Sequence, residues 1–278
     1  MTAQIPQIRP IKRLLIPLDG AQPSASIVPY AAGLAATLQA RLILFRSVES
    51  DDQIKRANDY LEEVAAGLRA AGMGAATHVG SGLPSAAIVA ASREYSADII
   101  VMTGHAHHQG RKDLLGSTAH RVLQRCATPV LVLRTSDTRW VPPASIVVGL
   151  DGSEASHGAL ETAKALSLLL NVELVLVRSV EPPSPLSGAA RYYGTVTDFA
   201  EQYLRDLQAG LSKEGLTVSI HVGSRGAEAE LLGVAGSRPG SIIVLSTTGL
   251  TGTPGVLGST TDRVVRSQSH PVLAVPVH

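Results

Sequence analysis

The chain contains one set of short motifs twice, in the same order, and this internal repeat limits what it can fold into. Leu18-Asp19-Gly20 recurs 132 residues later as Leu150-Asp151-Gly152. The other recurring motifs are Arg-Ser-Val-Glu at 46–49 and 178–181, His-Val-Gly-Ser at 78–81 and 221–224, and Pro-Val-Leu at 129–131 and 271–273. A repeat unit of about 140 residues is too long for a solenoid, so each copy is expected to be a complete domain.

The two predicted domains are residues 1–138 and 139–278. The boundary between them falls in segment 135–143, which contains Trp140 and two prolines and has the composition of a linker. Each domain is long enough to bury a hydrophobic core of its own.

Short apolar runs alternate with segments of helical periodicity in both copies. The expected strands are 13–18, 41–48, 75–79, 98–103 and 128–134, then 145–150, 172–179, 216–221, 241–245 and 271–276. The expected helices are 24–38, 51–71, 84–95, 117–126 and 154–170, and 181–194 is expected to be a loop. The alternation predicts an α/β fold class, with two tandem open parallel sheets covered by helices on both faces.

Composition narrows the classes of function. A net charge of +1 gives no basic stripe for a nucleic-acid partner, and one Trp and two Phe leave few rings for base stacking. The single cysteine, Cys126, excludes an internal disulfide, fits a reducing compartment and is interpreted as a core residue. No segment approaches the roughly 20 apolar residues of a membrane span, and no signal peptide is visible. We therefore expect a cytoplasmic protein with no nucleic-acid and no membrane partner.

Two related glycine-containing loops, 104–118 and 246–260, each follow an expected strand and lead into a helix. Such a loop presents free backbone N–H groups at the positive end of the helix dipole, and glycine allows an anion to approach closely. The candidate phosphate-binding residues are Gly104, Gly116, Ser117 and Thr118 in the first loop, and Gly249, Gly258, Ser259 and Thr260 in the second. Ser117 and Ser259 are also candidate helix N-caps. No Lys precedes either serine and no G-x-G-x-x-G is present, so Walker A and dinucleotide sites are disfavoured.

Asp19 and Asp151 each end the first strand of their copy. Ligands of open α/β sheets bind beyond the carboxyl ends of the strands, so these carboxylates are candidates to accept hydrogen bonds from ribose hydroxyls or an adenine amine. The alternative is that each aspartate caps the following helix.

Other polar residues near the loops give weaker signals. Arg121 and Arg263 occupy equivalent places on the helices. They could neutralise a bound phosphate, but cations one turn into a helix more often face solvent. His105, His107 and His108 cluster in the first loop only, with no cysteine nearby, so no metal site is predicted. No Ser-His-Asp or Cys-base set recurs in both copies, and no catalytic residue is predicted.

Four motifs of the first copy resemble those of the universal stress protein family. The first strand ends in Pro17-Leu18-Asp19-Gly20, and Gly82-Leu83-Pro84 precedes the third helix. Ala-Asp-Ile-Ile-Val-Met at 97–102 leads into the loop, and Thr-Pro-Val-Leu-Val at 128–132 forms the last strand. The chain looks like a tandem universal stress protein, with two such domains covering nearly all of it.

The resemblance implies a fold, a ligand and a mode of pairing. The fold is the Rossmann-like, adenine-nucleotide alpha-hydrolase-like domain, and the two domains are expected to pack as a pseudo-twofold pair through their last strands, 130–133 and 272–275. In the ATP-binding branch of the family the loops hold the phosphates of ATP, with or without Mg²⁺. Asp19 and Asp151 would then meet the adenosine end, with Pro17 in the same site. A further homodimer stays open.

Both loops depart from the family's ATP-binding pattern, Gly-x2-Gly-x9-Gly-Ser/Thr. The first has His107 at the second glycine and the second has Ser246 at the first, and each has eight residues rather than nine before the last glycine. Gly149 also stands where the first copy has Pro17.

The second loop is predicted to be the better ATP site. Glycine recurs there at every third position from Gly249 to Gly258, so the loop is nearly free of side chains, whereas Asp113 in the first loop would repel phosphate. Three functions remain: a non-catalytic ATP-binding regulator of the stress response, a nucleotide-free member acting through protein contacts, and a slow ATPase.

Overall fold

The computed structural model describes residues 10–104, 115–134, 139–183, 193–248, 256–267 and 269–277. The first half contains β1 (Arg13–Pro17), α1 (Gln22–Ala25), α2 (Val28–Leu38), β2 (Arg41–Val48), α3 (Ile54–Ala70), β3 (Ala75–Ser81), α4 (Pro84–Glu94), β4 (Ile99–Thr103), α5 (Ser117–Arg125) and β5 (Val130–Leu133). The second half contains β6 (Ser145–Gly149), α6 (Glu154–Leu170), β7 (Glu173–Ser179), α7 (Tyr193–Lys213), β8 (Val218–Gly223), α8 (Ala227–Gly236), β9 (Ile242–Ser246), α9 (Ser259–Ser267) and β10 (Val272–Val275).

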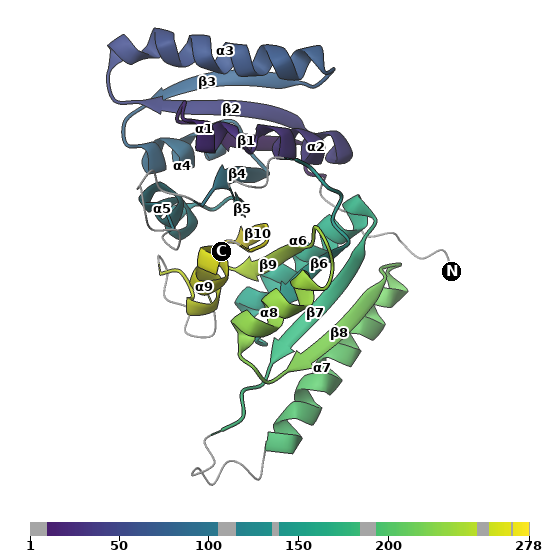
Figure 1. Cartoon of the computed structure of the whole chain (residues 1–278). Coiled ribbons are helices and arrows are strands. Elements are labelled where there is room, and N and C mark those ends of the chain that lie inside the picture. Colours follow the sequence, from purple (N-terminus) through teal and green to yellow (C-terminus); the bar gives the residue numbers. More distant parts are fainter. Residues whose placement is uncertain are drawn as a thin grey trace.

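The described strands form one sheet of ten, in the order β3-β2-β1-β4-β5-β10-β9-β6-β7-β8 (Figure 1). The second half of this order is the first half reversed, which is the pattern of a pseudo-twofold pair. β5 and β10 meet at the centre and run antiparallel, with Leu131 opposite Leu273, while the pairings within each half are parallel. The predicted pairing of the two last strands is therefore confirmed.

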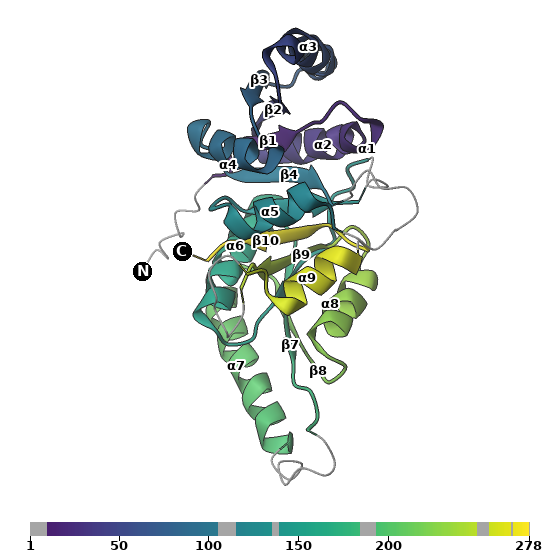
Figure 2. The same ribbon diagram turned by 90° about the vertical axis from the view of Figure 1, so that its left-hand side faces the viewer.

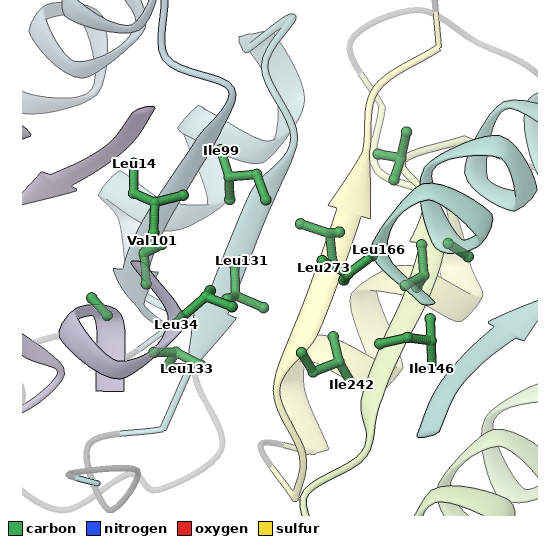
Figure 3. Packing of buried hydrophobic residues seen from close by; sticks show 14 of the residues in the cluster. Leu14, Leu34, Ile99, Val101, Leu131, Leu133, Ile146, Leu166, Ile242 and Leu273 are labelled. Carbon is green, nitrogen blue, oxygen red and sulfur yellow. The ribbon is translucent and has the colours of Figure 1, made fainter. Parts of the chain in front are cut away.

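Helices cover both faces of this sheet, which explains why its central strands are continuous apolar runs rather than alternating ones. One face of the sheet is covered by α2, α3, α6 and α7, and the other by α4, α5, α8 and α9. Figure 2 shows the molecule from the side of the second group. The core under the first group of helices crosses the junction between the halves, because Leu131 and Leu273 belong to one cluster with Leu34 and Leu166 (Figure 3). Burying each leucine side chain contributes about 1.5–3 kcal/mol.

The part of the linker that the structure describes packs against the first half. The Trp140 ring lies edge-on to Tyr30 of α2, with centroids 5.0 Å apart. A Cβ placed on Gly33 would lie 2.2 Å from the Cβ of Trp140, so only glycine permits this contact. The linker therefore fixes the start of β6 relative to α2.

Each predicted strand is present, with its ends displaced by two residues at most. The single helix predicted over 24–38 is wrong, because α1 ends at Ala25 and α2 begins at Val28. Pro29 explains the break, since its nitrogen cannot donate a helical hydrogen bond. The predicted helix over 51–71 begins as a 3-10 turn at Asp51–Gln53. Of the predicted loop 181–194, the last two residues already belong to α7, and 184–192 lie outside the described residues.

None of the described helices combines the length and the apolar character needed to cross a membrane.

Candidate functional site

A cavity of about 290 Å³ opens at the carboxyl ends of β6, β7 and β9 in the second half. From β6 the chain proceeds outward through β7 and β8, while β9 lies on the other side of β6, so the cavity occupies the topological switch point of this half. The predicted site residues in its lining are Asp151, Gly258, Ser259 and Thr260. Gly249, the remaining predicted residue of this half, lies outside the described residues.

The first turn of α9 forms one end of the cavity. The first helical hydrogen bond described runs from the Asp262 N–H to the Gly258 carbonyl oxygen, at 2.8 Å. The N–H groups of Ser259, Thr260 and Thr261 precede it and have no acceptor within the helix. The Thr261 hydroxyl donates to the Ser246 carbonyl oxygen at 2.7 Å and ties this turn to the end of β9. An anion here would meet backbone donors, two further hydroxyls and the positive end of the helix.

Asp151 forms the middle of the cavity edge. Its Oδ1 accepts hydrogen bonds from the Ser153 N–H at 2.9 Å and the Ser153 hydroxyl at 2.5 Å. Burial raises the pKa of Asp151, but the hydrogen bonds from Ser153 and Ser156 outweigh it and leave the pKa below its ordinary value. The N-cap of α6 is Ser153, whose hydroxyl accepts from the Ser156 N–H. Asp151 therefore shapes the turn before the helix, and the alternative that it is itself the cap is wrong.

The first half has the same turn with different neighbours. Asp19 Oδ1 accepts from the Ala21 N–H at 2.8 Å and also from the Ser24 hydroxyl. Ala21 is the N-cap of α1, so Asp19 is not a cap either. Pro17 is the last residue of β1 and is half-buried.

The start of the first loop is joined to its end. The Gly116 N–H donates to the Gly104 carbonyl oxygen at 2.8 Å, which brings two predicted residues together. Gly116 is the N-cap of α5, so the alternative of Ser117 as an N-cap is wrong; Ser117 and Thr118 are the first two helical residues. Residues 105–114, including His105, His107 and His108, lie outside the described residues.

The hydrogen bonds correct the predicted equivalence of the two loops. The bond from Gly116 to Gly104 has its counterpart in the bond from the Gly258 N–H to the Thr247 carbonyl oxygen, at 2.7 Å. Thr247, not Ser246, therefore occupies the place of Gly104. The strand before the loop keeps an offset of 143 between Ile99 and Ile242, and the second loop is one residue shorter.

The weaker candidates, Arg263, Arg121 and Cys126, do not line the cavity. The Arg263 Nε donates to the Ser259 carbonyl oxygen at 3.2 Å and lies 3.8 Å from Glu228, so it is occupied within the protein. Arg121 is exposed, as expected. Cys126 is buried next to the Ser92 hydroxyl, which agrees with its interpretation as a core residue.

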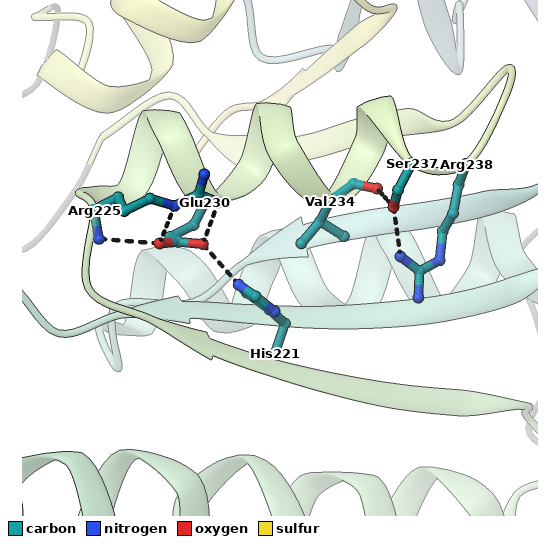
Figure 4. Close-up of polar contacts among 6 residues, drawn as sticks. All are labelled: His221, Arg225, Glu230, Val234, Ser237 and Arg238. Atoms are coloured by element: carbon teal, nitrogen blue, oxygen red, sulfur yellow. Dashed lines mark hydrogen bonds and ion pairs between the residues drawn. The ribbon is translucent and has the colours of Figure 1, made fainter.

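No sequence motif indicates the ionic cluster around the buried Glu230 beside the cavity. Glu230 of α8 is 3% exposed and lies between His221 of β8 and Arg225 (Figure 4). Its carboxylate accepts from the Arg225 backbone N–H, Nε and Nη2, each at 3.0 Å, and lies 2.7 Å from His221 Nε2. These Arg225 hydrogen bonds outweigh burial and hold the pKa of Glu230 far below its ordinary value. The cluster fixes the start of α8, whose Ala227 and Leu231 line the cavity.

Comparison with known proteins identifies the family of this chain. The model of the universal stress protein family matches residues 10–134 and again residues 144–276. The chain belongs to the universal stress protein family. Universal stress protein Rv2623 of Mycobacterium tuberculosis strain H37Rv is 29% identical over 203 residues, which cover 70% of this chain and 67% of that protein. The corresponding protein of strain CDC 1551 matches equally.

Solved structures share the fold over nearly the whole chain. A universal stress protein from Archaeoglobus fulgidus superposes with a TM-score of 0.76 and 21% identity, covering 95% of this chain and 98% of that one. A functionally unknown protein from Pseudomonas aeruginosa gives a TM-score of 0.72 and 18% identity, covering 96% and 92%. The tandem, Rossmann-like architecture of this universal stress protein is thus found in other proteins at low sequence identity.

Proposed function

We propose that this universal stress protein is a non-catalytic, ATP-binding regulator of the stress response, and that its second half holds the nucleotide. The observation that carries the proposal is the cavity, where Asp151 and the first turn of α9 meet at the switch point of the sheet. Helix dipole, backbone donors and hydroxyls suit a phosphate group at one end. A carboxylate with a lowered pKa suits ribose hydroxyls beyond it.

The cavity crosses the ends of three neighbouring strands, β9, β6 and β7. Neighbouring strands lie about 4.8 Å apart, so this edge spans roughly 10 Å, which suits a nucleotide lying along it. The phosphates would lie at Ser259 and Thr260, the ribose at Asp151, and the base at Val177 and Ser179 of β7. Ser179 lines the cavity, and its Oγ is buried and has no hydrogen-bond partner within the described residues. A buried unpaired hydroxyl is costly, and a polar edge of the base would satisfy it.

The lining favours binding over turnover. Asp151 is the only ionisable side chain among the described lining residues, and its lowered pKa makes it a weak base. The sequence of the loop at 249–255 contains no ionisable residue. Mg²⁺ bound with ATP would take most of its ligands from phosphate oxygens and water. We therefore place the slow ATPase behind the non-catalytic regulator.

Nucleotide extraction from the purified chain tests the proposal against its rivals. We expect denaturation of freshly purified protein to release ATP, and incubation with ATP to give no turnover above that of a Gly258→Val control. Release of no nucleotide, together with no binding in calorimetry, would support the nucleotide-free alternative. Turnover that Gly258→Val abolishes would support the ATPase.

A matched pair of serines tests where the ligand lies. Ser179 and Ser219 both carry a buried hydroxyl without a partner in the described part of the chain, but only Ser179 lines the cavity. Both Ser→Ala variants should keep or slightly raise the melting temperature. Only Ser179→Ala should weaken ATP binding, by about 1 kcal/mol or roughly 5-fold. Equal ATP affinities of the two variants would remove the base from this end of the cavity.

A further inference from the structure

An arginine and a tyrosine pack behind each Asp-Gly turn, on the face of the sheet opposite the cavity. Val177 and Ser179 line the cavity, and Arg178 lies between them on β7, so its side chain points to the other face. The Arg178 guanidinium carbon lies 5.0 Å from the centre of the Tyr203 ring of α7. This distance is that of a cation–π contact.

The guanidinium also supports the turn that carries Asp151. Gly152 has φ of 85°, and a Cβ built on it would lie 3.2 Å from Arg178 Nη1, so the arginine lies directly against the turn. The pKa of the Tyr203 phenol is raised, mainly by burial, with Arg178 lowering it and Asp151 raising it. The Tyr203 hydroxyl lies 3.1 Å from His157 Nε2 and so connects the pair to α6.

The first half contains the same arrangement. Arg46 lies 5.4 Å from the centre of the Tyr60 ring, and a Cβ on Gly20 would lie 2.4 Å from Arg46 Nη1. Burial and the Asp19 carboxylate raise the pKa of Tyr60, while Arg46 lowers it. Arg46 and Arg178 are the first residues of the recurring Arg-Ser-Val-Glu motif. Two copies with different loops thus keep one way of supporting the Asp-Gly turn.

We infer that Arg178 and Tyr203 are positioning residues for ligand binding in the second half: they hold the Asp151-Gly152 turn in place from behind, and they touch no ligand themselves. The inference rests on the proposed function, because it assigns the purpose of the turn to nucleotide binding. Its physical basis is that a carboxylate on a loosened turn must be ordered again whenever the ligand binds, which reduces affinity.

A double-mutant cycle between Arg178 and Asp151 tests the inference. Arg178→Met removes the charge and keeps the bulk of the side chain. It should weaken ATP binding about 10-fold, a loss no larger than that expected when Asp151→Ala removes the carboxylate itself. In the Asp151→Ala background, the same change should have no further effect on ATP affinity. Inorganic phosphate, which needs only the α9 end, should bind equally to Arg178→Met and the wild type. The same loss of ATP affinity in both backgrounds would overturn the inference.

The equivalent residue of the first half provides the control. Arg46→Met should lower the melting temperature as much as Arg178→Met, because the packing is alike, but should leave ATP affinity unchanged. Equal losses of affinity would reduce the effect to general destabilisation and would overturn the inference. If Arg178→Met does not fold, Tyr203→Leu takes its place in the cycle, with the same expected outcomes.

A ligand-free measurement separates this inference from the proposed function. The Ser153 N–H donates to Asp151 Oδ1, so its hydrogen exchange reports on the turn. Arg178→Met should accelerate this exchange, and an unchanged rate would overturn the inference. A wild-type chain that binds no ATP would refute the proposed function, and with it the positioning role, while the exchange rate would still show whether Arg178 holds the turn.

Discussion

The two halves of this universal stress protein have the same strand order but different walls around the ligand edge. Phe45 and Val177 are equivalent, because they pair with His78 and His221 respectively. The Phe45 ring lies over Gly80, where its Cζ would be 2.7 Å from a Cβ. In the second half the Glu230 carboxylate takes this place, over Gly223.

The helices that pack on these strands, α4 and α8, also differ at the matching position. Ala87 and Glu230 are equivalent, because each N–H bonds to the carbonyl oxygen of the N-cap residue of its helix. The pair Phe45–Ala87 of the first half is thus replaced by Val177–Glu230 in the second. One strand order thus accommodates either an aromatic or an ionic side chain on the same face of the sheet, and the two halves differ at both positions together.

The largest effect on stability is expected when a carboxylate is placed at position 87 of the first half, against Phe45. Ala87→Glu would bury a carboxylate against Phe45 without an equivalent of Arg225, because Gly82 stands at that position. His78, the counterpart of His221, is already stacked on the Tyr95 ring with centroids 3.9 Å apart, so a buried carboxylate without the arginine should lower the free energy of unfolding by about 3–5 kcal/mol. Thermal and urea unfolding measure the loss. A loss below that of Glu230→Ala would contradict the account, because Arg225 is 63% exposed and can be rehydrated when its partner is removed.

The next effect compares the two aspartates. Asp151→Ala should weaken ATP binding by about 1.5–3 kcal/mol, or roughly 10- to 150-fold, because a hydrogen bond to a charged acceptor is lost. Asp19→Ala should leave ATP affinity unchanged and should affect only stability, since it loses its bonds from Ala21 and Ser24. Calorimetric titration of the two variants measures both. Equal affinities in a chain that binds ATP would show that Asp151 does not contact the nucleotide.

A smaller effect concerns acid. The pKa of Glu230 is lowered from its ordinary value of 4.5 by Arg225 and His221. Its stabilising effect is therefore complete above that value and is lost as the pH falls toward the lower pKa of the folded state. Unfolding measured between pH 7 and pH 3 should show a steeper loss in the wild type than in Glu230→Gln, which cannot ionise. Parallel curves would mean that Glu230 does not contribute to the acid sensitivity.

The sequence was sufficient for the fold but only for part of the site. Periodicity and the repeat predicted every strand, and the apolar strands 130–133 and 272–275, together with the family resemblance, predicted the junction between β5 and β10. The turn of Asp151 and the start of α9 followed from motifs that are local in sequence. The register of the second loop did not, because one missing residue between Thr247 and Gly258 cannot be located without the hydrogen bonds.

The contacts missed by the sequence connect different elements. Arg178 and Tyr203 meet through the packing of α7 on β7, although the recurring Arg-Ser-Val-Glu motif could have marked the arginine. Glu230 shares the first turn of α8 with a second carboxylate, Glu228, so the sequence alone favours an exposed side chain. Its burial depends on His221 and Arg225, and on the small Val177 beside them.

We expect the second half alone to bind the nucleotide well, so the number of ATP molecules bound per chain is the decisive measurement. Isothermal titration calorimetry of the full chain should give one ATP per chain at the stronger site. Gly258→Val should abolish this binding, since its side chain would enter the cavity beside α9, and Gly116→Val should leave it intact. Two equal sites per chain, or a greater loss from Gly116→Val than from Gly258→Val, would contradict the account.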